Sequence, residues 1–323
     1  MKTTTIIRRC LAGAIGLPLL AAVPACGGPS AGTPAAQQAA PANSARSQPR
    51  NSATTPAPSA TATGRSAKPT PSASAPEQAD PFGSAADEYV DDRTGTVTAA
   101  VYDVTTGQTW SFGSSRPQAE ASVVKLNILE ALYARHGAGS GGLSASDTSL
   151  AREMMEDSDN DAATTLWDEA GGPSQIASFD TSAGLTHTEP SSCVQCPGFP
   201  WPGWGLSTTT PTDQLALLRE LIKPSTLLTG TQRNSALQLM ENVAPSQRWG
   251  VSGGVPAAAT VALKDGWLPL NSSNTDWQIN SVGWVSGRGR DYLMAVFSTG
   301  NPSEQYGIDT INQLGALVWQ HLG

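Results

Sequence analysis

The chain has 323 residues, of which 27 are acidic and 19 are basic, and its formal net charge is −8. Seven of the basic residues but only two of the acidic residues precede residue 81, so the remainder of the chain is strongly acidic. An acidic domain is repelled by the phosphate backbone, which argues against nucleic acid as a partner.

The first 26 residues have the pattern of an export signal. Three basic residues precede an apolar run over residues 10–25, which is too short for a comfortable transmembrane helix. Small residues ahead of Cys26 resemble a bacterial lipobox, in which the cysteine is diacylated and becomes the new N-terminus, although Pro24 departs from the usual pattern. We expect a signal peptide over residues 1–26 and a lipid on Cys26 that holds the exported protein at the outer face of the cell membrane. The alternative is an ordinary secretory signal that releases the protein.

Residues 27–82 consist largely of Ala, Pro, Ser and Thr, with almost no aromatic or large aliphatic side chains. Such a segment cannot bury a core, and it predicts a disordered, semi-extended linker. The remaining residues, 83–323, are enough for one large domain, and they contain no internal repeat.

Elements near the start of this domain are predicted from hydrophobic periodicity and turn residues. A short helix is expected over residues 85–92, a strand over 95–104 and a second strand over 109–112, with a glycine-containing turn that makes the two strands a hairpin. The next helix begins at Ser122, runs to about residue 136 and ends in a glycine-rich stretch.

Helices dominate the middle of the domain and strands return towards its end. The predicted helices cover residues 146–156, 161–170, 173–179, 211–222 and 230–243. The predicted later strands cover residues 260–264, 278–285 and 292–298, and a helix over residues 303–322 follows. Strands from both ends of the domain with helices between them indicate an α+β fold, in which one antiparallel sheet packs against a helical block.

A serine and a lysine at the start of one helix are the first candidate catalytic residues. Ser122 and Lys125 lie three residues apart, which places hydroxyl and amine on the same helix face. Unpaired backbone N–H groups at a helix N-terminus favour the oxyanion that forms when the serine attacks an acyl carbon, and a buried lysine can lose its proton and act as a base. An ordinary helix start with a solvated lysine is the alternative.

Two further motifs follow in an order that carries chemical meaning. Ser158-Asp159-Asn160 lies between two predicted helices, and Lys264-Asp265-Gly266 lies at the end of a predicted strand. Taken separately, the first could be a helix-capping turn and the second a hairpin turn. Together, the order S-x-x-K, S-D-N and K-x-G resembles the penicillin-recognising serine enzymes, particularly the class A β-lactamases.

Each motif residue then has an expected role. Ser158 can pass a proton between Lys125 and the leaving nitrogen, and Asn160 can hold the substrate amide. Lys264 offers a positive charge to a substrate carboxylate and lowers the proton affinity of its neighbours. We expect Gly266 to let the strand edge approach the acyl chain closely. By the family pattern, the backbone N–H groups of Ser122 and Trp267 form the oxyanion hole.

The sequence also departs from this family. Asp265 stands where a threonine or serine is usual, which removes a hydroxyl and adds a negative charge that would weaken carboxylate binding. The deacylation motif E-x-x-L-N is not intact, since Ser-Ser-Cys-Val follows Glu189-Pro190. Glu189 remains the candidate base for the deacylating water, and the alternative is an exposed loop carboxylate. Without a positioned water, the acyl-enzyme would persist.

Cys193 and Cys196 are the cysteines of the exported domain. In an oxidising compartment this C-x-x-C pair is expected to form a disulfide within the long loop over residues 185–210, while free thiols and a metal site are the alternatives. A zinc site would need two more ligands, and the three histidines have no ligand-like spacing. We expect neither metal nor cofactor. The length of the loop and its Pro, Gly and Trp content indicate a functional segment.

These residues lead to three functional hypotheses. The first is a membrane-anchored, monomeric serine hydrolase that opens β-lactam rings. The second is a D,D-peptidase, or penicillin-binding protein, that acts on peptidoglycan stem peptides. The third is a non-catalytic cell-wall-binding lipoprotein that retains the fold. The intact serine and lysine motifs favour an enzyme, whereas Asp265 and the broken deacylation motif are features of a binding protein.

Overall fold

The computed structural model describes residues 78–136 and 142–322. The expected signal peptide with Cys26, nearly all of the expected linker and most of the glycine-rich stretch after the first long helix lie outside the described residues. None of the described helices is both long enough and apolar enough to cross a membrane.

A five-stranded antiparallel sheet forms the centre of the domain, with strand order β2-β1-β7-β6-β5. The first strands in sequence pair with the last, and Ala100 of β1 lies opposite Ala295 of β7. The sheet is therefore built from both ends of the domain, as the sequence predicts. Its strands are β1 (Thr96–Asp103), β2 (Thr109–Phe112), β5 (Thr260–Pro269), β6 (Trp277–Gly287) and β7 (Arg290–Asn301).

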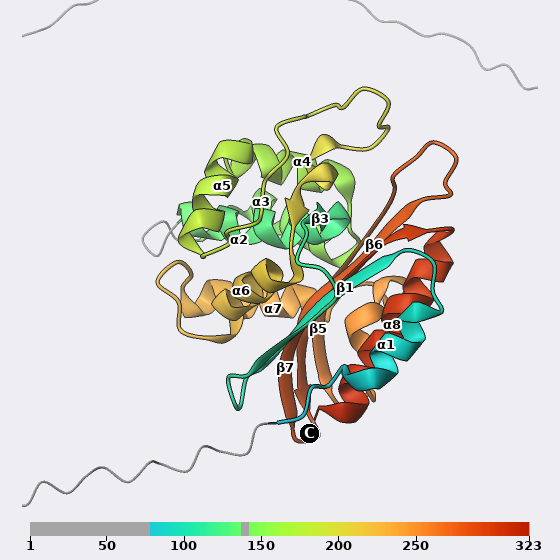
Figure 1. Ribbon diagram of the computed structural model, residues 1–323. Helices are drawn as coiled ribbons and strands as arrows, with labels where there is room; N and C mark the ends of the chain where they lie inside the picture. Colours follow the sequence, from blue (N-terminus) through green and yellow to red (C-terminus); the bar gives the residue numbers. More distant parts are fainter. Residues whose placement is uncertain (1–77, 137–141, 323) are drawn as a thin grey trace, which may run out of the picture. The chain divides into compact units, whose positions relative to one another are not determined.

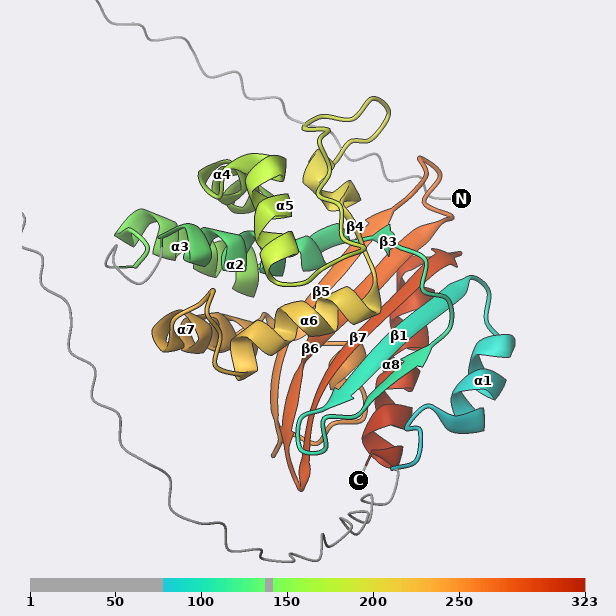
Figure 2. The same ribbon diagram turned by 60° about the vertical axis from the view of Figure 1, so that its left-hand side comes forward.

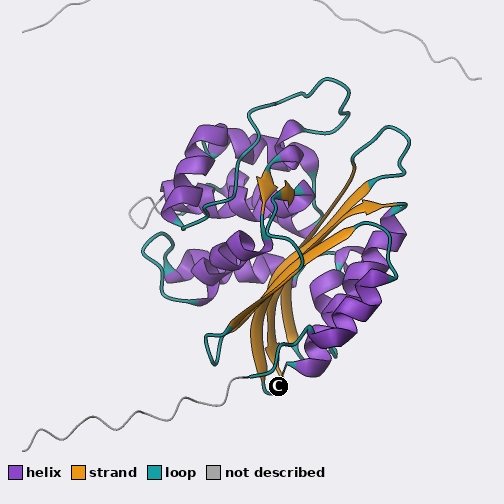
Figure 3. Cartoon of the chain, viewed as in Figure 1, coloured by secondary structure: helices purple, strands orange, loops and turns teal. Residues whose placement is uncertain are grey.

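Helices cover both faces of this sheet, and neighbouring strand residues belong to different hydrophobic clusters (Figures 1 and 3). Ala100 and Tyr102 pack with the helical block, whereas Ala99 and Val101 pack on the face covered by α1 (Gly83–Asp91) and α8 (Glu304–His321). This alternation follows from the two-residue period of a strand. It explains why the strands are buried on both sides rather than amphipathic.

Among the described residues, the helical block contains six α-helices between β2 and β5, and Figure 2 shows it from a second side. Side chains cap several of these helices, as when Thr210 accepts a hydrogen bond from the backbone N–H of Asp213 at 3.2 Å. The helices are α2 (Val124–His136), α3 (Ala145–Glu156), α4 (Asn160–Glu169), α5 (Gly172–Ser182), α6 (Pro211–Ile222) and α7 (Gly230–Glu241).

Besides shifts of a few residues at the ends of other elements, two features differ from the sequence prediction. β5 does not end at Lys264 but continues to Pro269, so the K-x-G motif lies inside a strand and Lys264 pairs with Val282. A second, two-stranded sheet joins β3 (Gln118–Ala119) to β4 (Thr208–Thr209). Its strands are too short to produce a recognisable alternation, yet they tie the segment before Ser122 to the end of the long loop.

Candidate active site

Ser122 lies in a short 3-10 turn, Ala121–Val123, that runs directly into α2. Ala121 adopts a left-handed backbone conformation with φ of 50°, which is unusual for a residue other than glycine. Strained backbone of this kind concentrates at functional sites. The turn leaves the Ser122 hydroxyl at the wall of a cavity, while the residues on either side of it are buried.

The Lys125 side chain is fully buried, and its Nζ atom is surrounded by oxygen atoms. Nζ lies 3.1 Å from the Ser122 Oγ atom and 3.0 Å from the Ser158 Oγ atom. It also lies 2.6 Å from the Ser158 carbonyl oxygen and 2.9 Å from the Asn160 Oδ1 atom. The sequence prediction that hydroxyl and amine meet on one helix face is thus matched by the geometry.

These four contacts suit a neutral amine. A carbonyl oxygen and an amide oxygen can only accept hydrogen bonds, so the Ser158 carbonyl and Asn160 Oδ1 take the two N–H groups of a neutral lysine. The nitrogen lone pair is then left for a hydroxyl proton, and the Ser122 hydroxyl is within reach. Burial and the nearby charge of Lys264 hold the pKa of Lys125 well below its usual value, and the charge of Asp159 opposes this shift.

The turn that carries Ser158 combines the capping role and the catalytic role that the sequence left as alternatives. Asp159 is the N-cap of α4, and its side chain accepts a hydrogen bond from the Ala162 backbone N–H at 2.7 Å. Ser158 has a positive φ of 58°, and the residues on both sides of the cap, Ser158 and Asn160, turn towards Lys125. The cap therefore positions its two neighbours.

Lys264 approaches the same hydroxyl from the sheet. Its buried Nζ atom lies 3.0 Å from the Ser158 Oγ atom and 2.8 Å from the Asp265 carbonyl oxygen. Burial lowers the pKa of Lys264, while the charge of Asp265 opposes the shift. The Ser158 hydroxyl thus connects the amines of two lysines and can carry a proton between Lys125 and a substrate atom.

The Asp265 side chain is not in the cavity, which corrects our expectation of a negative charge beside the substrate. Alternate residues of a strand point to opposite faces, so Asp265 faces away from the helical block. Its Oδ2 atom accepts a hydrogen bond from the Trp249 backbone N–H at 2.9 Å, and its cross-strand neighbour is Ser281. Burial raises the pKa of Asp265. The threonine or serine hydroxyl that is usual at this position in the class A pattern is absent.

Gly266 is required for a reason that the sequence prediction missed. A Cβ atom at this position would lie 2.8 Å from the backbone nitrogens of both Ser122 and Val123 and 3.0 Å from the Glu120 carbonyl oxygen. The absent side chain therefore allows the nucleophile turn to pack against β5. Because β5 is the edge strand of the sheet, this packing places Trp267 next to that turn.

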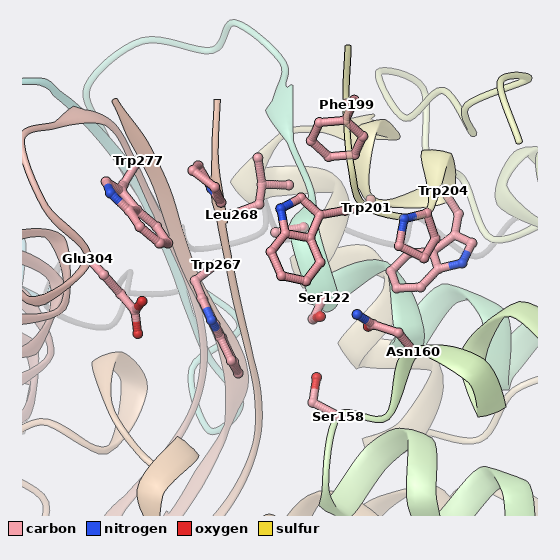
Figure 4. A pocket seen from close by; sticks show the side chains of 14 residues that line it. Ser122, Ser158, Asn160, Phe199, Trp201, Trp204, Trp267, Leu268, Trp277 and Glu304 are labelled. Carbon is pink, nitrogen blue, oxygen red and sulfur yellow. The ribbon is translucent and has the colours of Figure 1, made fainter. Parts of the chain in front are cut away.

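A cavity of about 310 Å³ opens above Ser122. Ser122, Ser158, Asn160 and Trp267 are the predicted site residues that line it, and Figure 4 shows them facing a common space. The lining residues that sequence reasoning did not assign are mostly aromatic or apolar and include one acid; those with large side chains are Phe199, Trp201, Trp204, Leu268, Trp277 and Glu304. The Trp-rich and Pro-rich composition of the long loop was the only signal for the first three.

Glu189 lies outside this cavity. Its backbone exchanges two hydrogen bonds with Thr208, at 2.8 and 3.0 Å, which extends the ladder formed by β4. The preceding Thr188 points inwards and donates a hydrogen bond to Asp213 at 2.8 Å. Neighbouring residues of an extended segment point in opposite directions, and the Glu189 side chain is exposed. The side of Lys125 that faces the loop is instead covered by the indole of Trp204, whose ring centroid lies 5.1 Å from Nζ.

Cys193 and Cys196 are joined in a disulfide. Gly203 packs against this bridge, since a Cβ atom there would lie 1.7 Å from the Cys193 carbonyl oxygen and 3.1 Å from the Cys196 Sγ atom. The bridge therefore supports the turn that carries Trp204, the next residue in the chain.

Residues 140–322 match the sequence profile of a family described as "Beta-lactamase enzyme family". A curated protein of Mycobacterium bovis, named "Putative lipoprotein LppW", is 30% identical over 211 residues, which are 63% of this chain and 63% of that protein. The protein of the same name from Mycobacterium tuberculosis gives the same values. The chain thus spans a little under two thirds of the length of these relatives.

Solved structures to which this chain is similar include class A β-lactamases. One from Mycobacterium abscessus is 21% identical with a TM-score of 0.61, and the match covers 73% of this chain and 97% of that one. One from Bacteroides cellulosilyticus is 18% identical with a TM-score of 0.64, and the match covers 75% and 97%. At these identities the likeness shows the fold, and the predicted α+β architecture is confirmed.

Proposed function

The chain belongs to the β-lactamase enzyme family, and from this premise we propose that it is a serine hydrolase that opens β-lactam rings through an acyl-enzyme on Ser122. The observation that carries the proposal is the position of the Lys125 Nζ atom, 3.1 Å from the Ser122 Oγ atom, with two oxygen acceptors that occupy the N–H groups of a neutral amine. A buried, neutral lysine is a competent general base.

Acylation proceeds in two proton steps. The Ser122 Oγ atom attacks the ring carbonyl and its proton passes to Lys125, while the backbone N–H groups of Ser122 and Trp267 stabilise the oxyanion. The ring C–N bond then breaks. The leaving nitrogen takes the proton of the Ser158 hydroxyl, and Lys125 returns its proton to Ser158. Lys264, 3.0 Å from the Ser158 Oγ atom, stabilises the negative charge that develops on that oxygen.

Release of the acyl group is slow in this proposal. The exposed side chain of Glu189 and the indole of Trp204 beside Lys125 support an acyl-enzyme that no carboxylate-activated water attacks. The same observations favour the second candidate function, a D,D-peptidase on stem peptides, because penicillin-binding enzymes form persistent acyl-enzymes with β-lactams. The hydrogen bonds that join Lys125 to Ser122 and Ser158 favour an enzyme over a non-catalytic wall-binding protein.

The site acts at the outer face of the cell membrane in this proposal. A lipid on Cys26 anchors the chain, and the name of the curated relative, which includes the word lipoprotein, supports this placement. A substrate of the cell wall, or a β-lactam that enters from outside, would then reach the site without crossing the membrane.

The test is a time course with a fluorescent penicillin on the purified full chain. We expect rapid labelling of the wild type, no labelling of Ser122→Ala, and loss of the label much more slowly than its formation. An unlabelled wild type would reject the acyl-transfer proposal. Rapid multiple turnovers would reject slow release and leave the β-lactamase function in place.

A further inference from the structure

The cavity has two chemically different walls. Figure 4 shows Asn160 and Trp204 on one side of Ser122, and Trp267, Trp277 and Glu304 on the other. The three residues of the second wall come from β5, from the first position of β6 and from the first position of α8. We call Trp267, Trp277 and Glu304 the acidic wall.

Glu304 is the charged residue of this wall. Its side chain is partly buried, and this burial raises its pKa. Within residues 78–136 and 142–322, the only carboxylate found within 4.0 Å of a basic side chain is that of Asp213, next to His187, so Glu304 has no ion-pair partner there. The N-terminus of α8 stabilises this carboxylate in part, and a cationic ligand would offset more of the unfavourable free energy of its burial.

The basic side chains described near the cavity make their contacts elsewhere and do not form an ion pair with Glu304. Lys125 and Lys264 are fully buried, and their amines contact the Ser158 hydroxyl. Arg93 contacts α8 near Glu304, but its guanidinium donates hydrogen bonds to the Tyr306 carbonyl oxygen and the Thr310 hydroxyl, both at 2.8 Å. Arg288 and Arg290 follow the K-x-G motif in the sequence and lie where β6 meets β7, at the other end of β6 from Trp277. Arg290 stacks on Trp319, with its guanidinium carbon 4.6 Å from the ring centroid.

Aromatic rings beside a carboxylate make a binding site for a positive charge. The face of an indole attracts a cation through its quadrupole, and Trp is the most effective side chain for this contact. In Figure 4, Trp277 lies above the Glu304 carboxylate and Trp267 lies on the side of it that faces Ser122; all three residues line the cavity. A ligand carboxylate placed against this wall would be repelled by ionised Glu304.

We propose that the acidic wall is a subsite for an ammonium group on one arm of the acyl donor. The inference rests on the proposed acyl transfer at Ser122, and it adds a preference: acyl donors that carry a positive charge beyond the reacting carbonyl bind more tightly than donors without one, such as benzylpenicillin. Binding of the ammonium group favours ionised Glu304, so affinity rises with pH through the pKa of this carboxyl group.

The test measures binding of choline and of its neutral carbon isostere, 3,3-dimethyl-1-butanol, by tryptophan fluorescence and NMR titration of the full chain. We expect choline to bind about 10-fold more tightly than the isostere, as a carboxylate and two indole faces together would give. Glu304→Gln should remove most of this difference. The matched control Glu169→Gln, which removes an exposed carboxylate from the end of α4, should leave it unchanged.

Equal affinity for choline and the isostere in the wild type would overturn the inference, as would equal effects of Glu304→Gln and Glu169→Gln. Because Glu304 lies in the first turn of α8, its replacement could weaken the helix. Trp277→Leu is therefore a second variant, and Trp277→Phe should restore part of the lost choline affinity. If neither Trp277 variant alters choline binding, the aromatic part of the subsite is wrong.

A further arm separates this inference from the proposed function. Choline binding needs no nucleophile, so Ser122→Ala should bind choline as the wild type does. If penicillin fails to label the wild type while choline binding still depends on Glu304, the acyl-transfer proposal fails and the subsite stands. If penicillin labels Ser122, choline should slow the labelling of the wild type but not of Glu304→Gln. Unaffected labelling would place the choline site away from the acyl donor.

Discussion

The indole ring of Trp204 lies 5.1 Å from the Nζ atom of Lys125, on the side of the lysine that the long loop covers. The ring is held in place by a hydrogen bond of 3.0 Å from its Nε1 atom to the Thr164 Oγ1 atom on α4. An indole in this place occupies space beside Lys125 and supplies no proton acceptor. The way in which the loop packs therefore bears directly on how the acyl-enzyme is released.

The first prediction concerns deacylation. Since the Glu189 side chain is exposed and outside the cavity, Glu189→Gln should change the rate of acyl release by less than about twofold. The rates are measured by single-turnover loss of a fluorescent penicillin. Trapping of the acyl-enzyme in this variant would show that Glu189 activates the water after all. Trp204→Ala, which opens space beside Lys125, should speed release, whereas Trp204→Phe should behave as the wild type.

The second prediction concerns the base. Lys125→Arg keeps a positive charge but cannot give a neutral amine, so the rate of acylation of Ser122 should fall about 100-fold or more. Stopped-flow labelling under pseudo-first-order conditions measures this rate. In the wild type, acylation should slow as the pH falls through the lowered pKa of Lys125, because the base becomes protonated. Acylation of Lys125→Arg at the wild-type rate would show that Lys125 is not the base.

The third prediction concerns stability and pH. Glu130 of α2 is fully buried with both carboxyl oxygens unpaired among the described residues, and burial first, then Glu220 and Asp180, raises its pKa well above the usual value. The folded state therefore keeps a proton that the unfolded state loses above the ordinary carboxyl pKa. Its stabilising effect is greatest at low pH and is lost as pH rises towards the folded pKa.

Glu130→Met removes this titrating group while filling a similar volume. Above the ordinary carboxyl pKa, and until the raised pKa of folded Glu130 is reached, the wild type should lose up to about 1.4 kcal/mol of unfolding free energy per pH unit more than Glu130→Met. Urea unfolding at a series of pH values measures the difference. Glu169→Met replaces an exposed glutamate and should follow the wild-type curve. Parallel curves for Glu130→Met and the wild type would mean that Glu130 is ionised in the folded state.

The fourth prediction concerns the anchor. If Cys26 carries the lipid, Cys26→Ser should leave the precursor uncleaved or move the protein into the medium, because the serine hydroxyl cannot take the thioether-linked lipid. Immunoblots of membrane and culture-medium fractions measure the distribution. Cys193→Ser, which breaks the disulfide but not the anchor, is the control and should remain with the membrane. Membrane retention of Cys26→Ser with normal cleavage would reject lipid attachment.

Much of the fold follows from local patterns in the sequence. The bounds of β2 and α6 are as predicted, because turn residues, an N-capping threonine and a helix-starting proline mark them. The run of β5 beyond Lys264 could not be predicted, because Asp265 and Gly266 are poor strand formers and only pairing with β6 keeps them extended. Tertiary contacts decide such a strand.

The candidate site likewise has residues whose positions the sequence predicts and residues whose positions it does not predict. The meeting of Ser122 and Lys125 follows from helix geometry, and their meeting with Ser158 and Lys264 follows from the order of family motifs. The positions of Trp204 and Glu304 follow from neither. A loop of irregular backbone places the first, and the packing of α8 against the sheet places the second, so both depend on long-range contacts that no short pattern encodes.

The central claim is that Ser122 is acylated, and peptide mapping by mass spectrometry after brief treatment with benzylpenicillin tests it most directly. Ring opening retains every atom of the β-lactam, so the account predicts one adduct with the full mass of the antibiotic on the peptide that contains Ser122. This adduct should be absent from Ser122→Ala, and in the wild type it should remain for many minutes after free drug is removed. A wild-type protein that stays unmodified would contradict the account, as would an adduct that also forms in Ser122→Ala.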